Sequence, residues 1–137
     1  MNGTLVIMGY IYNPDGFDWM NFKLSKDNPY TFHHIVSKSS GGNNSISNGA
    51  ILTRRAHDLL HLIEYVCPEA YEDLEDIFYR INVSMKPPDD EIISEIDAIL
   101  HALFTKDGYE FVEDIDLDEY MKIYYGNKKN KQRKQRK

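Results

Sequence analysis

The chain has little cysteine and no long apolar run, and both absences narrow what it can be. One of its 137 residues is cysteine, which excludes an intramolecular disulfide and a zinc site built from several cysteines. No stretch approaches the roughly 18 uncharged apolar residues of a membrane-spanning helix. The N-terminal segment lacks the basic start and the long apolar run of a signal peptide. We therefore expect a cytoplasmic protein without membrane contact.

Positive charge is scarce outside the last ten residues. The chain has 16 Lys and Arg against 22 Asp and Glu, for a net charge of −6. Residues 128–137, KKNKQRKQRK, hold seven of these 16 basic residues and no acidic one, so removing them takes the net charge from −6 to −13. A cationic end on an acidic body favours a polyanionic partner, with phosphates as the first candidate. The alternative is a disordered end that only aids solubility.

The first third of the chain has the composition of strands and loops. Residues 3–12 are rich in β-branched and aromatic types, which predicts a strand. Residues 17–24 alternate loosely and fit either a strand or an irregular segment. Short strands are predicted at 30–36 and at 49–52, with a glycine- and asparagine-rich loop between them.

The rest of the chain has helical spacing of its apolar residues. Helices are predicted from Arg54 to Val66, over 69–83, from an aspartate cap at 89 or 90, and after Asp116. Strands followed by helices are typical of an α+β fold. We expect one domain over residues 1–125 and a disordered basic tail at 126–137.

Four of the five histidines fall within one short stretch of the sequence. His57 and His61 are four apart on a predicted helix, so they share one face. His33 and His34 are adjacent on a predicted strand and point to opposite sides. One of these two can join the helical pair on a metal ion, and three nitrogen ligands with an open position are typical of a catalytic metal. The other histidine then suits a general base, because imidazole titrates near neutral pH.

These residues resemble a known motif. The segment 31–64, TFHHIVSKSSGGNNSISNGAILTRRAHDLLHLIE, is similar to the HNH nuclease motif, the ββα-metal fold. His34, Asn48, His57 and His61 follow one another at intervals of 14, 9 and 4 residues, in the order of that motif. The resemblance is closest to the branch of the colicin DNases and of many phage or mobile-element endonucleases. It places the motif at about residues 31–66.

The resemblance assigns a role to each matching residue. His34 is expected to be the general base that activates water. His33, His57 and His61 are expected to hold a divalent ion, with Mg²⁺, Mn²⁺, Ni²⁺ and Zn²⁺ all open. Asn48 is expected to brace the loop and orient His34, although some branches place this asparagine on the metal.

The expected function is a metal-dependent endonuclease that hydrolyses DNA phosphodiester bonds, of the phage or mobile-element type. Two alternatives stay open: a nucleic-acid-binding module with a structural metal, and a ribonuclease that uses the same motif. Arg54 and Arg55 at a helix start are candidates for phosphate contact, or for solvated surface charge. The tail residues expected to bind nucleic acid are Lys128, Lys129, Lys131, Arg133, Lys134, Arg136 and Lys137.

Two other features look like sites but are expected to have ordinary roles. His101 lies on a predicted helix next to Leu100 and is expected to be an ordinary surface or core residue. The acidic run at 110–119 is expected to be a solvated face with a helix cap rather than a second metal site.

Overall fold

The structure is a computed structural model that describes residues 3–12 and 15–135, with side chains described as far as residue 126. In those residues it has a two-stranded antiparallel sheet and five α-helices, which confirms the α+β class. The elements are α1 (Gly3–Tyr12), β1 (Tyr30–His34), β2 (Gly49–Thr53), α2 (Arg54–Val66), α3 (Pro68–Ser84), α4 (Asp90–Thr105) and α5 (Asp118–Gln135).

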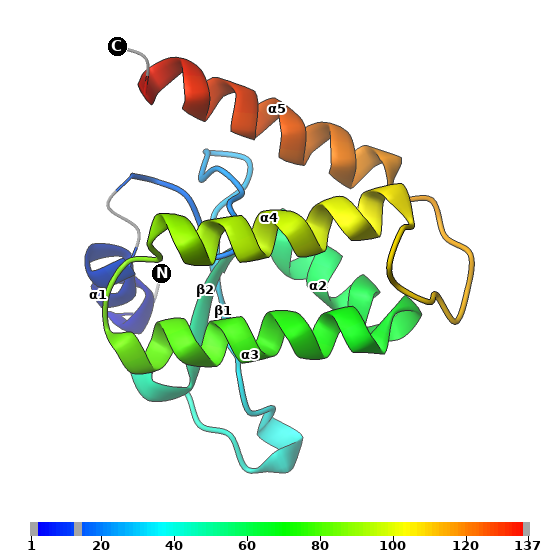
Figure 1. Ribbon diagram of the computed structural model, residues 1–137. Coiled ribbons are helices and arrows are strands. Elements are labelled where there is room, and N and C mark those ends of the chain that lie inside the picture. The colour runs from blue at the N-terminus through cyan, green and yellow to red at the C-terminus, as the bar shows by residue number, and fades with distance from the viewer. Residues whose placement is uncertain (1–2, 13–14, 136–137) are drawn as a thin grey trace.

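The hairpin of β1 and β2 lies at the centre, between the N-terminal helix and the helical layers. In Figure 1, α3 and α4 run side by side in front of the hairpin, and α5 follows α4 on its outer side. Helix α2 leaves β2 directly and packs against α3. The loop of residues 35–48 projects away from the helices at the bottom of Figure 1. No helix in the described ranges is both long enough and apolar enough to cross a membrane.

Residues 3–12 are a helix, so the predicted N-terminal strand is wrong. Leu5, Met8 and Tyr12 are the buried residues of α1, and their spacing of three and four is that of a helix face. The β-branched and aromatic composition favoured a strand, but composition is a weak guide when tertiary packing selects the period. The segment at 17–24 is irregular and forms only isolated bridges.

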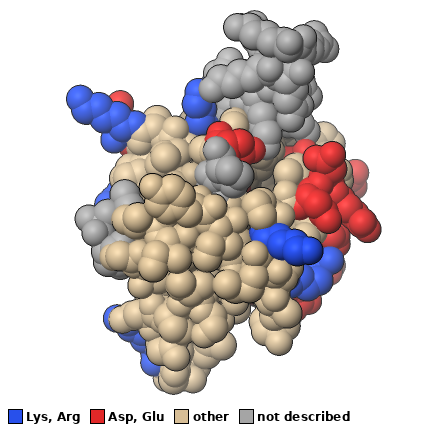
Figure 2. All heavy atoms as spheres, turned by 90° about the vertical axis from the view of Figure 1, so that its left-hand side faces the viewer, with Lys and Arg blue, Asp and Glu red and all other residues tan. Residues whose placement is uncertain are grey.

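The outer side of α1 leaves apolar side chains in contact with solvent. Tyr10 is 85% exposed, and Val6 and Ile7 are about half exposed. In Figure 2 the centre of the face on the α1 side is largely without charged residues, while acidic residues gather at its right-hand side and Lys and Arg side chains lie at several places around it. The apolar all-round composition of α1 explains why its periodicity was obscured in the sequence.

The helical half agrees with the sequence pattern. Thr53 caps α2, its hydroxyl oxygen accepting from the Ala56 backbone N–H at 3.4 Å, and Asp89 caps α4 by accepting from Ile92 N–H at 2.9 Å. Pro68 stands in the first turn of α3, where its missing N–H costs no hydrogen bond. The apolar residues of α2 that recur at intervals of three and four are all buried: Ala56, Leu59, Leu60, Ile63 and Val66.

Helix α5 differs from the expected tail. Its backbone is helical from Asp118 to Gln135 and so passes through most of the segment predicted to be disordered. Lys, Arg and Gln are good helix formers, and a helix already started by buried residues can extend through them. The side chains of the basic tail residues and all of residues 136–137 lie outside the described part of the chain.

Asp18 joins the irregular segment to the start of α2 and is itself buried. Its Oδ1 accepts from the backbone N–H groups of Met20 and Phe22 at 2.8 and 2.9 Å. Its Oδ2 accepts from Thr53 N–H at 2.6 Å. Burial raises the pKa of Asp18 to about 6, although these backbone N–H donors act in the opposite direction. One carboxylate thus fixes the N-cap of the helix that carries His57 and His61.

We expect Asp18→Ala to lower the free energy of unfolding by about 3 kcal/mol, because it leaves three buried N–H groups without an acceptor. The measurement is urea unfolding, with the exposed Asp27→Ala as control, which should change by less than about 0.5 kcal/mol. The native pKa lies above the unfolded value of 3.8. The native state therefore binds more protons than the unfolded state between about pH 4 and 6. The free energy of unfolding that depends on Asp18 falls as pH rises through that window. Equal effects of both substitutions would contradict the role of Asp18.

Candidate metal centre

Three of the predicted histidines converge on one point. His33, His57 and His61 each offer a ligand atom, and these atoms lie within 4.8 Å of one another. The ring centroids are 5.4 Å apart for His33 and His57, 6.2 Å for His33 and His61, and 4.8 Å for His57 and His61. Nitrogen ligands on one tetrahedral ion are about 3.4 Å apart, so small side-chain rotations would close the set. The predicted convergence is confirmed, and the residues fit a divalent ion with a preference for nitrogen.

The hairpin and α2 deliver these side chains from two directions. His33 pairs with Ala50 of β2 in the strand register and points inward, with 4% of its surface exposed. His57 and His61 project from adjacent turns of α2 with their rings stacked at 24°. The ring of Phe78 on α3 lies 6.1 Å from that of His33 and is an apolar neighbour of the cluster.

The hydrogen bonds of Thr31 define which nitrogen of His57 is available. The Thr31 hydroxyl donates to the Leu52 carbonyl at 2.8 Å. Its oxygen lies 2.8 Å from His57 Nδ1 and therefore accepts from Nδ1–H. Nε2 of His57 keeps its lone pair for a metal, which is the arrangement that an oxygen partner imposes on a ligating imidazole.

His57 is also held in its neutral form. Burial lowers the pKa of His57 to about 4, and the charges of His33, His61, His34 and Arg54 act in the same direction. Only the neutral ring can bind a metal, so at pH 7 His57 needs to lose no proton to become a ligand.

Carboxylates accompany the other two histidines of the cluster. Glu75 on α3 contacts His33 Nε2 through its Oε1. Glu64 lies one turn further along α2, with Oε1 3.6 Å from His61 Nδ1. Each member of the cluster therefore has an oxygen atom beside one ring nitrogen. Glu75 was not among the residues predicted from the sequence, because nothing in the chain marks a contact across 42 positions.

His34 lies on the opposite side of β1 from the cluster, as predicted. Its Nε2 is 2.7 Å from Asn44 Oδ1, and an amide oxygen only accepts, so Nε2 carries the proton. Nδ1 is left with a lone pair that can accept a proton from water. The ring packs edge-on against Phe32 at 4.8 Å, which restricts its rotation.

Asn48 braces the loop, but it does not hold the His34 ring. Its Oδ1 accepts from Val36 N–H at 2.7 Å, and its Nδ2 donates to Val36 O and Asn43 O at 2.9 Å. It stands just before β2 rather than on it. The predicted orienting role falls to Asn44 instead, since it is Asn44 that bonds the His34 ring. The only sequence feature that pointed to Asn44 was its place in the asparagine-rich loop after β1.

Gly41 and Gly42 allow the loop of residues 35–48 to turn back toward β2. Gly41 has φ +90°, a left-handed conformation that favours glycine. A Cβ on Gly42 would lie 1.7 Å from the Val36 carbonyl oxygen. The backbone therefore passes too close to Val36 for any other residue type.

Helix α3 supports the same loop from the side of the core. Asn82 is buried, and its Nδ2 donates to the carbonyls of Ile46 and Gly49, both at 2.7 Å. Glu75, Phe78 and Asn82 lie at intervals of three and four, so they share one face of α3. This face completes the cluster, although it lies outside the segment that resembles the HNH motif.

The two arginines at the start of α2 have different surroundings. Arg54 is exposed, and its charge is near enough to affect the pKa of His57. Arg55 is also exposed, but its Nη1 lies 3.8 Å from Glu119 Oε1 on α5. Arg54 is therefore the better placed of the two for a phosphate at the cluster.

His101 and the acidic run are separate from the cluster, as expected. The Nδ1 of His101 lies 2.8 Å from the Tyr125 hydroxyl, and the side chain is exposed. In the acidic run, Asp116 accepts from Asp118 N–H at 2.9 Å at the start of α5. Within the described residues, the histidine cluster is the one group of metal-ligating side chains with converging atoms.

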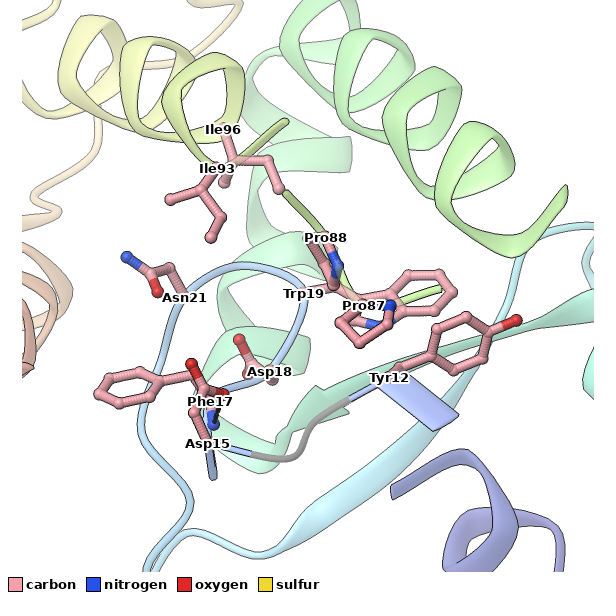
Figure 3. Close-up of a pocket in the computed structure, with 10 residues that line it drawn as sticks. All are labelled: Tyr12, Asp15, Phe17, Asp18, Trp19, Asn21, Pro87, Pro88, Ile93 and Ile96. Atoms are coloured by element: carbon pink, nitrogen blue, oxygen red, sulfur yellow. Dashed lines mark hydrogen bonds between the residues drawn. The ribbon is translucent and has the colours of Figure 1, made fainter. Parts of the chain in front are cut away.

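A pocket of about 110 Å³ lies elsewhere, beside the segment that holds Asp18 and Trp19 (Figure 3). Pro87 and Pro88 close it from the link between α3 and α4, and Ile93 and Ile96 from α4. No histidine lines it. It is therefore distinct from the candidate metal centre.

Comparisons of this chain with protein-family models, with curated proteins and with solved structures find no match. The likeness to HNH nucleases therefore rests on the residues and spacing of segment 31–64 and on the arrangement of its histidines.

Proposed function

We propose that this protein is a metal-dependent endonuclease that hydrolyses phosphodiester bonds of DNA, acting in the cytoplasm, of the type found in phages and mobile elements. One observation carries the proposal. Three imidazoles gather on one side of β1 and α2, while a fourth, His34, stands on the other side of the same strand with an available nitrogen. A purely structural metal site has no need of that fourth histidine.

His33, His57 and His61 would hold the divalent ion. Bound there, the ion would neutralise charge that develops on the scissile phosphate and on the leaving 3′ oxygen. His34 Nδ1 takes a proton from water, and the water oxygen attacks phosphorus in line with the leaving group. Asn44 keeps the His34 ring in the tautomer that accepts this proton. Arg54 and the N-terminus of α2 offer positive potential to the phosphate.

The test is incubation of supercoiled plasmid with the protein and Mg²⁺, Mn²⁺, Ni²⁺ or Zn²⁺, with a chelator as the metal-free control. Conversion to open-circular or linear DNA with at least one metal is expected. A protein that binds metal and DNA but cuts with none of the four metals is a binding module with a structural ion. A protein that cuts RNA under the same conditions but leaves DNA intact is a ribonuclease.

The basic tail is proposed to add affinity for DNA. Deleting residues 128–137 removes seven positive charges from an acidic chain. We expect weaker binding and a shallower dependence of affinity on salt, by about 0.9 in log–log slope for each phosphate that the tail no longer neutralises. Fluorescence anisotropy with a DNA duplex at several salt concentrations measures the slope.

A full-length variant with the seven tail Lys and Arg replaced by Gln is the matched control for chain length. It should behave like the truncation. A salt slope that stays at the wild-type value in both variants would assign the tail a role in solubility only.

A further inference from the structure

Glu75 reaches the cluster from an element that the HNH-like segment does not include. It lies on α3, and its Oε1 contacts His33 Nε2. The side chain of His33 is 5% exposed and that of Glu75 is 16% exposed, so the contact is shielded from water. An ionised carboxylate accepts hydrogen bonds and donates none. The contact therefore requires the proton on Nε2 of His33.

We propose that Glu75 is a positioning residue that fixes His33 as its Nε2–H tautomer and leaves Nδ1 as the nitrogen that binds the ion. The inference rests on the proposed metal centre and deepens it. A neutral imidazole carries one proton, so a proton held on Nε2 means a lone pair on Nδ1. Without Glu75, either nitrogen could be protonated, and part of the population would present N–H to the ion.

Glu75 acts through His33 rather than as a further ligand. Among the described residues, the side chains whose ligand atoms come together are the three histidines, and Glu75 is not in that set. The Tyr71 hydroxyl lies near the Glu75 carboxylate. Burial and the nearby Glu75 and Glu64 raise the pKa of Tyr71. The Tyr71 hydroxyl thus keeps its proton and can donate to these carboxylates.

Glu75 also differs from the oxygen partners of the other two histidines. Thr31 and Glu64 belong to β1 and α2, the elements that carry the cluster. Glu75 belongs to α3, so its contact depends on how α3 packs against α2. The position of the helix that follows the motif thereby determines which nitrogen of His33 faces the ion.

The tautomer can be measured directly by long-range ¹H–¹⁵N correlation NMR of the metal-free protein at pH 7.5. We expect His33 to be protonated on Nε2 in the wild type, and Glu75→Ala to shift the population toward Nδ1–H. A wild-type His33 protonated on Nδ1 would overturn the proposal. So would a tautomer that stays fully Nε2–H in Glu75→Ala.

Metal affinity provides a second readout, with Zn²⁺ in competition with a chromogenic chelator. Outer partners of ligating histidines typically contribute about 10–100-fold to affinity. We expect a loss in that range for Glu75→Ala and a smaller loss for Glu75→Gln, whose amide oxygen can still accept. Glu72→Gln removes the same charge from an exposed site on α3 and is the control, with affinity expected to stay within about twofold. Wild-type affinity in Glu75→Ala would overturn the proposal.

These outcomes separate the inference from the proposed nuclease function. A protein that shows the Glu75-dependent tautomer and Zn²⁺ affinity but cuts no nucleic acid would refute the function and leave the inference standing. A nuclease whose Zn²⁺ affinity is the same with and without Glu75 would refute the inference and leave the proposed function standing. If Glu75→Ala fails to fold, the wild-type tautomer and the Glu75→Gln affinity decide.

Discussion

Replacing His34 by alanine is expected to abolish DNA cleavage while metal and DNA binding stay near wild type. The substitution removes the proposed base and no ligand, since His34 lies outside the converging set. Loss of a general base typically costs about 10²–10⁴ in rate. Plasmid nicking under single-turnover conditions measures the rate, and Zn²⁺ titration measures the retained affinity.

His101→Ala is the matched control, because His101 is an exposed histidine on α4 that bonds Tyr125. It should cut DNA at the wild-type rate. Wild-type cleavage by the His34 variant would show that another group activates the water. A parallel loss of Zn²⁺ affinity in that variant would show that His34 belongs to the metal centre.

Replacing His57 by alanine is expected to lower both metal affinity and cleavage. His57 is the member of the cluster whose Nε2 lone pair is set by Thr31 and whose neutral form is favoured by burial. Removing a direct ligand should weaken Zn²⁺ binding by at least about 100-fold, the upper end of what an outer partner contributes. Alanine favours the helix, so α2 should remain folded.

The two histidine variants therefore have different signatures. For His57→Ala, raising the metal concentration should recover part of the cleavage, because His34 is still present. For His34→Ala, added metal should recover nothing. A His57 variant with unchanged Zn²⁺ affinity would place the ion elsewhere and contradict the three-histidine centre.

The site was predictable to the extent that its residues are close in sequence. Periods of four on a helix and of two on a strand are local rules, and they were enough to bring His57 and His61 together and to separate His33 from His34. The residues that refine the site are of another kind. Glu75 and Asn82 act across 42 and more than 30 positions, through the packing of α3 on the hairpin. No local pattern encodes such a contact.

Local spacing in the sequence predicted the two strands, the starts of the four later helices, the aspartate cap of α4 and the shared face of His57 and His61. The choice of His33 as the third ligand came from the resemblance to the HNH motif. The tertiary structure decided what local rules leave open. It made residues 3–12 a helix, because Leu5, Met8 and Tyr12 could be buried on one face against the hairpin. It assigned the His34 ring to Asn44 and the His33 ring to Glu75. Burial energy and the need to satisfy buried polar groups depend on which surfaces meet, and only the folded chain defines those surfaces.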